Sequence, residues 1–255
     1  MIKIGGAVFD SGDTTVEDVI SLQKQGKSLI IVHGGGNLVT EWMARQGIST
    51  RFVNGERVTD RAALEMVVAV LGGLANKEIV AAINSAGGRA VGISGVDGSL
   101  IQGHIKDEKL GYVGTVVKVD TMLLEALLRA GYIPVVAPVS LRSSDKADDA
   151  PQIVNVNGDI AAGEIAATVG AERIIFLTDV TGVCDKSGKL LLRLSASEAE
   201  ALVASGVASG GMIPKITACL KALATIPMAR IIDGRQPHAL LGELEGQGSG
   251  TTIYV

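Results

Sequence analysis

The chain has 255 residues, 47% of them hydrophobic and 20% charged, and a formal net charge of -4. Its length and apolar content can bury a substantial core, as one large α/β unit or as two lobes. The acidic balance and an aromatic share of only 3% exclude a nucleic-acid-binding protein, which needs clustered basic side chains and stacking rings. No stretch approaches the roughly 18 uninterrupted apolar residues of a membrane span, and no secretory signal opens the chain, so we expect a cytoplasmic protein without a membrane partner.

Cysteine and histidine form no metal-binding or nucleophilic motif in this sequence. Cys184 and Cys219 have neither zinc-ligand spacing nor a C-x-x-C arrangement, so we expect both to be reduced thiols. His33, His104 and His238 lie far apart in different contexts. The sequence therefore predicts no metal held by the protein's own side chains and no hydrolytic triad.

Short β-branched runs alternate with longer helical patterns along the chain. The expected strands are 2–4, 28–32, 90–93, 132–136, 173–177 and 230–232. The expected helices are 16–24, 37–46, 61–72, 76–86, 121–130, 158–169, 196–204 and 214–224. Parallel strands need crossover helices, so this alternation predicts an α/β fold with a mainly parallel central sheet between two helical layers.

Two places interrupt the alternation. Residues 100–119 break into short polar and glycine-bearing pieces, which predicts antiparallel hairpins or a small lid. A second strand-to-glycine-turn arrangement starts after Gly170. We therefore expect an N-terminal lobe of residues 1–170 and a C-terminal lobe of residues 171–255.

The helix expected at 61–72 is apolar almost all round, with only Glu65 interrupting the run from Ala62 to Leu71. Such a helix must be covered on both sides. Two interpretations stay open: a central core helix within one chain, or a helix whose second face packs against another subunit.

Ligands of an open parallel sheet bind beyond the carboxyl ends of its strands, where turns meet helix N-termini. Four such turns carry glycine or unusual polar residues: "KIGG" at 3–6, "HGGGN" at 33–37, "NVNGD" at 155–159 and "TDVTGV" at 178–183. Gly34 to Gly36 could bind an anion with main-chain N–H groups, or could simply form a tight turn. Neither the dinucleotide pattern G-x-G-x-x-G nor a Walker loop is completed anywhere in these segments.

Charged residues stand at the same turns. Lys3 ends the first strand, and Lys215 follows Pro214 near the start of a helix, where a cation opposes the helix dipole unless an anion lies nearby. Each lysine alone could be an ordinary surface residue, but together they favour a phosphate-bridging role. Asp159 could cap its helix or hold both lysines, and Asp179 could form a turn or organise a nucleotide site.

The motifs "KIGG", "VHGGGN", "VNGERVTD", "LANKEIV", "GYVGTV", "NVNGDIAA", "LTDVTGV" and "SGGMIPK" together make the chain resemble the amino-acid kinase family from Met1 to Val255. Within that family it is most similar to the enzymes that phosphorylate N-acetyl-L-glutamate. The resemblance implies a three-layer αβα sandwich of the carbamate kinase-like type. It also implies ATP-dependent phosphorylation of the side-chain carboxylate of N-acetyl-L-glutamate in arginine biosynthesis, with Mg²⁺ carried by the ATP phosphates.

By this resemblance, the catalytic residues are Lys3, Lys215 and Asp159. The expected N-acetylglutamate site consists of Gly35, Gly36, Arg57 and Asn155. The expected ATP site consists of Gly6, Asp179, Val180, Thr181, Gly182, Val183, Cys184, Val207, Ala208 and Ser209. A carboxylate acceptor is already ionised at neutral pH, so the chemistry needs no general base, and the sequence offers no candidate for one.

Alternatives remain at this point. A kinase that acts on carrier-protein-linked acetylaminoadipate in lysine biosynthesis shares much of the outline. A noncatalytic amino-acid-binding module would have lost a phosphoryl-transfer lysine, and a kinase of another small substrate would carry other residues at Arg57 and Asn155. The chain begins at its first strand, without the N-terminal helix that links hexameric members, so we expect a homodimer built on the helix at 61–72.

Overall fold

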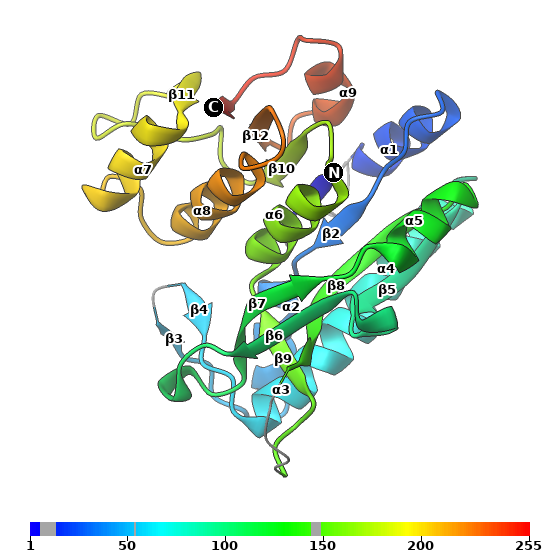
Figure 1. Cartoon of the computed structure of the whole chain (residues 1–255), viewed down its shortest axis with the longest axis vertical. Coiled ribbons are helices and arrows are strands. Elements are labelled where there is room, and N and C mark those ends of the chain that lie inside the picture. The colour runs from blue at the N-terminus through cyan, green and yellow to red at the C-terminus, as the bar shows by residue number, and fades with distance from the viewer. Residues whose placement is uncertain (6–13, 54, 144–148) are drawn as a thin grey trace.

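The computed structural model describes residues 1–5, 14–53, 55–143 and 149–255. A central sheet runs through the molecule with helices packed on both of its faces, as Figure 1 shows. The fold is therefore the mixed α/β sandwich that the alternation of strands and helices predicts.

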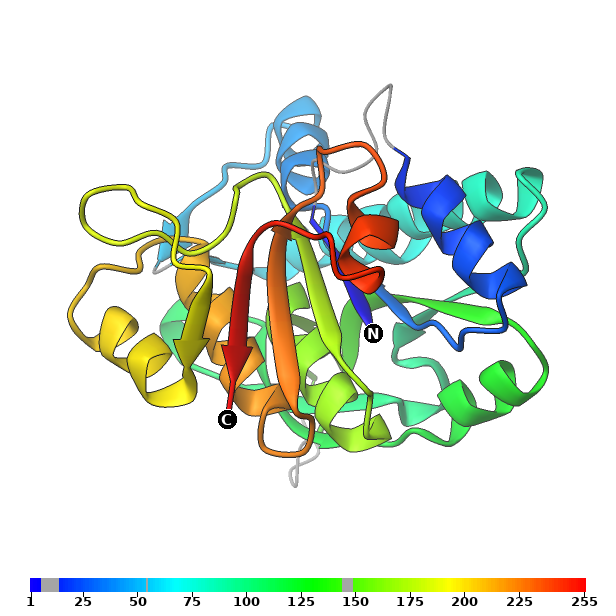
Figure 2. The ribbon, with the colours of Figure 1, turned by 90° about the horizontal axis from the view of Figure 1, so that it is seen from above.

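Eleven strands of the described residues form this sheet, in the order β11-β13-β12-β10-β1-β2-β8-β6-β7-β9, with β5 paired to β8. Most neighbouring pairs are parallel; β12–β13, β6–β7 and β8–β9 are antiparallel. The strands are β1 Ile2–Ile4, β2 Ile31–His33, β5 Ala90–Gly95, β6 Ile101–Ile105, β7 Val113–Val119, β8 Ile133–Arg142, β9 Ile153–Val156, β10 Ile174–Thr178, β11 Arg193–Ser195, β12 Met228–Asp233 and β13 Thr251–Tyr254. Figure 2 shows β10, β12 and β13 side by side.

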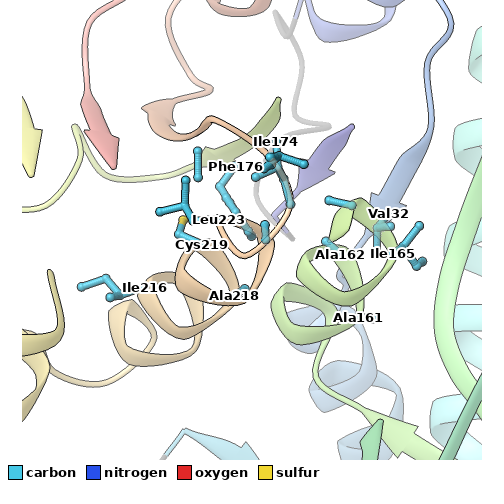
Figure 3. Packing of buried hydrophobic residues seen from close by; sticks show 14 of the residues in the cluster. Val32, Ala161, Ala162, Ile165, Ile174, Phe176, Ile216, Ala218, Cys219 and Leu223 are labelled. Atoms are coloured by element: carbon cyan, nitrogen blue, oxygen red, sulfur yellow. The ribbon is translucent and has the colours of Figure 1, made fainter. Parts of the chain in front are cut away.

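The helices of the described residues are α1 Thr15–Lys24, α2 Gly36–Arg45, α3 Arg61–Val67, α4 Asn76–Ser85, α5 Met122–Arg129, α6 Gly158–Val169, α7 Ala196–Ala204, α8 Met212–Ala222 and α9 Ala239–Leu244. Helices α5, α6 and α8 contribute to the hydrophobic cluster on one face of the sheet, and α1, α4 and α9 to the cluster on the other. Figure 3 shows α6 and α8 side by side over β10 and β2.

Side-chain alternation along the central strands decides which residues reach each layer. In β10, Ile174 and Phe176 pack under α6 and α8, whereas Ile175 and Leu177 pack toward α1 and α9. In β1, Ile2 and Ile4 also face the α1 side. The intervening Lys3 must therefore point toward α6, although it is buried.

The segment 100–119 forms the antiparallel hairpin β6–β7, as expected, with a register shift between Gln102 and Gly103. It is not a free-standing lid, because β6 also pairs with β8 and β7 with β9. A separate two-stranded hairpin, β3 Phe52–Val53 and β4 Glu56–Arg57, lies outside the main sheet. The sequence did not reveal this hairpin as an element, nor β9, β11, β13 and α9, because all are short and lack a clear period.

The helix expected at 61–72 continues without a break through a π-helical segment, η1 Val68–Ala75, into α4. By length and composition this helix, Arg61–Ser85, could cross a membrane, a test that buried core helices also pass. Val67, Val70 and Leu71 pack on α2 and β8, but Ala62, Ala69 and Gly73 are exposed. The interpretation as a core helix covered on all sides by its own chain is therefore wrong, because the chain covers one face of the helix and leaves the other exposed.

Asp18 of α1 links the two ends of the chain. Its buried carboxylate accepts hydrogen bonds from the N–H groups of Leu240 and Leu241, both at 3.2 Å, and contacts Nδ1 of His238 at 2.7 Å. The hydrogen bond and the negative charge of Asp18 raise the pKa of His238 above its ordinary value of 6.5. The protonated imidazole thus helps to hold α9 on α1.

This contact predicts a pH-dependent stability. Because the pKa of His238 is raised in the folded state, its contribution is complete below pH 6.5 and is lost as pH rises through the folded pKa. In urea unfolding, His238→Gln should lower the free energy of unfolding more at about pH 5.5 than at about pH 8.5. The left-handed backbone at this position, φ 53°, adds a strain that does not vary with pH. A difference that is the same at both pH values would contradict the charged contact.

Candidate functional site

Three of the four glycine turns meet at one edge of the sheet. The N–H of Gly34 donates to the carbonyl of Ile4 at 2.9 Å, and that of Gly5 donates to Leu177 at 3.1 Å. A Cβ on Gly158 would lie 3.4 Å from the carbonyl oxygen of His33, so the start of α6 approaches the end of β2 at van der Waals distance. The carboxyl ends of β1, β2 and β10 and the N-terminus of α6 thus surround one site.

A buried carboxylate stands between two ammonium groups at this edge. Asp159 Oδ1 lies 2.7 Å from Nζ of Lys3, and Asp159 Oδ2 lies 3.2 Å from Nζ of Lys215. The side chains of Lys3 and Asp159 are only 7% and 6% exposed, and that of Lys215 is 17% exposed. The structure therefore brings together residues that are up to 212 positions apart in the chain, 3 to 215.

The capping role considered for Asp159 belongs to Asn157. Its Oδ1 accepts hydrogen bonds from the N–H groups of Asp159 at 2.8 Å and Ile160 at 3.2 Å. Both carboxylate oxygens of Asp159 are therefore available to the lysines. Burial alone would raise the pKa of the Asp159 carboxyl, but the positive charges of Lys3 and Lys215 outweigh it and hold that pKa below its ordinary value of 3.8.

Close packing of α6 on α8 brings Asp159 to Lys215. Gly163, one turn after Asp159, faces Ala218 so closely that a Cβ would lie 2.6 Å from the Ala218 carbonyl oxygen. Ala218, the α8 residue that Gly163 faces, is itself small and buried (Figure 3). The separation of two packed helices depends on the side chains between their axes. The small residues at this contact therefore bring α8 close enough for the Lys215 side chain to reach Asp159.

A pocket of about 210 Å³ opens beside the charged group. It is lined by Lys3, Gly34, Gly35, Gly36, Val39, Phe52, Gly55, Glu56, Arg57, Val67, Leu71, Val113, Pro138, Asn155, Val156, Asn157, Gly158 and Asp159. All four residues expected at the acceptor site line this pocket, together with two of the three expected catalytic residues. A surface of cations, main-chain N–H groups and apolar walls is suited to a small anionic molecule.

Arg57 is fixed by its neighbours. Its Nη2 donates to the carbonyl of Gly36 and to Oγ1 of Thr40, both at 2.7 Å, and its Nη1 contacts Thr50 Oγ1 at 3.3 Å and Met43 Sδ at 3.4 Å. A bidentate grip on a carboxylate needs two free N–H groups. Binding of that kind therefore requires that at least one of these contacts be exchanged.

Phe52 is a pocket residue that sequence reasoning missed. It is 53% exposed although it lines the pocket, and the Arg57 guanidinium stacks over its ring at 4.8 Å from the centroid. The N-G dipeptide at 54–55 is a hairpin signal that could have placed this aromatic residue beside Arg57. Asn155 lies across the pocket on β9 and donates from Nδ2 to Thr59 Oγ1 at 3.1 Å.

The residues expected at the nucleotide site lie in two turns of the other half of the sheet. The first, from Asp179 to Cys184, follows β10; Gly182 has φ 143°, and the N–H of Val183 donates to Thr251 Oγ1 at 2.8 Å. The second, from Val207 to Ser209, joins α7 to α8, upstream of Lys215. Gly6 lies outside the described residues. No described interaction joins either turn to the acceptor pocket, so their common role stays a prediction.

Sequence comparison relates the chain to a known protein family. The family model described as "Amino acid kinase family" matches residues 1–232. A protein of Dehalococcoides mccartyi named acetylglutamate kinase is 49% identical over 99% of this chain and 93% of its own length. Proteins of the same name from Thermosynechococcus vestitus and Nostoc sp. are 46% and 45% identical, over 96% and 99% of this chain and 83% and 86% of their own lengths.

Solved structures agree on the fold. The protein smu.665 of Streptococcus mutans UA159 superposes with a TM-score of 0.84 at 26% identity, over 99% of this chain and 97% of its own. Carbamate kinase from Giardia lamblia gives a TM-score of 0.71 at 15% identity, over 99% and 97% of the two chains, which shows the fold alone. With the family model matching most of its length and relatives near half identical, the chain belongs to the amino acid kinase family.

Proposed function

We propose that this protein transfers the γ-phosphoryl group of ATP to the side-chain carboxylate of N-acetyl-L-glutamate, giving N-acetyl-L-glutamyl 5-phosphate in arginine biosynthesis. The observation that carries the proposal is the group of two lysines on one buried aspartate, beside a pocket that is lined by Arg57 and by the glycine turn after β2. The name shared by relatives at 44% to 49% identity supports the same substrate.

The reaction needs positioning and charge neutralisation. One oxygen of the acceptor carboxylate attacks the γ-phosphorus, the bond from that phosphorus to the bridging oxygen of ADP breaks, and ADP leaves with its electron pair. The acceptor is ionised at neutral pH, so no proton is removed. Lys3 and Lys215 neutralise the charge on the phosphoryl oxygens as the group moves. Asp159 keeps both ammonium groups aimed at that position.

Acceptor binding uses the walls of the pocket. The N–H groups of Gly35 and Gly36, at the start of α2, are placed to bind a carboxylate oxygen near the positive end of the helix dipole. Arg57 supplies a full positive charge for the second carboxylate of the substrate, and Asn155 an amide that can bond to the acetamido group. Val67 and Leu71 offer apolar contacts for its methylene and methyl groups.

The nucleotide is assigned to the C-terminal lobe, residues 171–255, and the acceptor to the N-terminal lobe, residues 1–170. The turns from Asp179 to Cys184 and from Val207 to Ser209 would hold ATP, with Gly6 near its phosphates. We assign Mg²⁺ to the phosphates of ATP rather than to a site built from the protein's own carboxylates. Bound there, Mg²⁺ supplies further charge neutralisation. We also propose that the enzyme acts in the cytoplasm. No observation favours the acetylaminoadipate reaction.

The acceptor can be tested directly. Purified protein with Mg²⁺ and ATP should form an acyl phosphate from N-acetyl-L-glutamate, which hydroxylamine traps as the hydroxamate. N-acetyl-L-aminoadipate, one methylene longer, and free L-glutamate, which adds an ammonium group, should react at least tenfold less efficiently in kcat/KM, since one methylene is worth about 10–200-fold in discrimination. Equal or greater efficiency with the longer acceptor would refute the substrate.

The role of Lys215 predicts a characteristic kinetic change. Lys215→Ala should lower kcat by about 100- to 1,000-fold, the usual cost of one charge-stabilising donor, and change KM for either substrate much less. Lys221→Ala is a matched control, since Lys221 also reaches from α8 to α6, at 3.3 Å from Glu164, but away from the pocket. Steady-state kinetics should show near wild-type turnover for the control. A KM increase as large as the kcat loss would contradict the role.

We further propose that the enzyme is a homodimer in which two copies of helix Arg61–Ser85 face each other. Only 39% of the most apolar window of this helix is buried within the chain. Ala62, Ala69 and Gly73 form an exposed stripe of small residues on the face away from β8, which lets a second helix approach closely. Leu71 of the same helix lines the pocket, so dimerisation would also stiffen the acceptor site.

A charge in this stripe should separate the subunits. Ala69→Glu should shift the mass measured by analytical ultracentrifugation from two chains to one, because the carboxylate would be buried without a partner. Ala201→Glu, an exposed alanine on α7, is the control and should remain dimeric. A wild-type protein that sediments as a monomer, or an Ala69→Glu variant that stays dimeric, would overturn this interface.

A further inference from the structure

His33 is a buried histidine that the proposed chemistry does not use. It ends β2 directly before the glycine turn and is 1% exposed. Its Nδ1 lies 2.8 Å from the carbonyl oxygen of Gly34, and its Nε2 lies 3.2 Å from Nδ2 of Asn76. A carbonyl oxygen only accepts, so Nδ1 carries the hydrogen and Nε2 accepts from the Asn76 amide. Burial lowers the pKa of His33 to about 4, which keeps this ring neutral at physiological pH.

Asn76 is itself fixed at the junction of η1 and α4. Its Nδ2 also donates to the carbonyl of Val135 at 2.9 Å, and its Oδ1 accepts from Nζ of Lys77 at 3.0 Å. A Cβ on Gly92 would lie 2.0 Å from that Oδ1, so the amide packs closely against the backbone of β5. A buried amide with this many contacts cannot rotate freely, and it therefore fixes the orientation of the His33 ring.

The ring in turn fixes the orientation of one peptide group. No peptide bond among the described residues is cis, so the C=O of Gly34 and the N–H of Gly35 point to opposite sides of their common plane. Because the carbonyl of Gly34 points to His33, the N–H of Gly35 points away from the ring. Gly35 N has no hydrogen-bond acceptor among the described residues, and Gly35 lines the pocket.

We propose that His33, held by Asn76, is a positioning residue for the acceptor: its hydrogen bond to the Gly34 carbonyl aims the Gly35 N–H at the reacting carboxylate. The inference rests on the proposed function and adds to it the residue that orients the Gly35 N–H. Without this bond, the Gly34–Gly35 peptide could rotate and present its carbonyl oxygen, which repels a carboxylate. Nucleotide binding should be unaffected, since no described contact joins the turns from Asp179 to Cys184 and from Val207 to Ser209 to this peptide.

Two substitutions distinguish the role of Nδ1 from that of Nε2. His33→Asn places an amide N–H near the position of Nδ1 and can keep the bond to Gly34, whereas His33→Gln places its amide near Nε2 and loses that bond. We expect His33→Gln to raise KM for N-acetyl-L-glutamate about tenfold, the usual effect of one hydrogen bond, with KM for ATP within about twofold of wild type. His33→Asn should restore most of the acceptor affinity. The thermal unfolding temperatures of both variants show whether a loss of acceptor affinity is due to a destabilised fold.

The proposal fails if the two variants raise KM for N-acetyl-L-glutamate equally, if KM for ATP rises in parallel, or if neither KM changes. Should both variants fail to fold, the ¹⁵N NMR spectrum of histidine-labelled wild-type protein decides the matter. A neutral ring with hydrogen on Nδ1 supports the proposal, and hydrogen on Nε2 or a charged ring overturns it. Absence of any acyl phosphate from wild-type protein would instead refute the proposed function. The NMR measurement of the His33 tautomer does not depend on activity, so the two failures can be told apart.

Discussion

The site depends on one buried carboxylate that pairs with two ammonium groups, one buried and one half-buried. Asp159 lies within 3.2 Å of both Lys3 and Lys215, and the side chains of all three are largely removed from water. Isolated charges would be strongly disfavoured there. The pairing leaves one excess positive charge, which an incoming anion can neutralise. The same group therefore offsets part of the buried charge when the site is empty and favours the binding of a negatively charged group.

Two structural features deliver the lysines to this carboxylate. Alternation in β1 directs Lys3 between Ile2 and Ile4 to the α6 face of the sheet. Contact between Gly163 and Ala218 brings α8, with Lys215, against α6 (Figure 3). Larger side chains at that contact would move Lys215 away from Asp159. Helix packing with small residues thus serves the proposed chemistry as well as the core.

In the proposed acceptor site, binding relies on main-chain donors rather than on charges alone. Gly35 has φ 144°, which other residues rarely adopt, and a Cβ there would lie 2.7 Å from a methyl of Leu71. Leu71 belongs to the π-helical segment, whose end carries Asn76, and Asn76 holds His33. One irregular helix thus shapes the apolar wall of the pocket and orients a polar donor. π-helical segments often occur at functional sites.

The sequence by itself determined the α/β class, the mainly parallel sheet, the antiparallel excursion at 100–119 and the glycine turns, because these follow from local periodicity and backbone chemistry. Together with the family resemblance, it also named Lys3, Asp159 and Lys215 before their distances were known. Only the tertiary structure decided that Asn157 rather than Asp159 caps α6, that Phe52 stacks on Arg57, and that one face of helix Arg61–Ser85 is uncovered. These features arise from contacts between segments far apart in the chain, which a pattern of neighbouring residues does not encode.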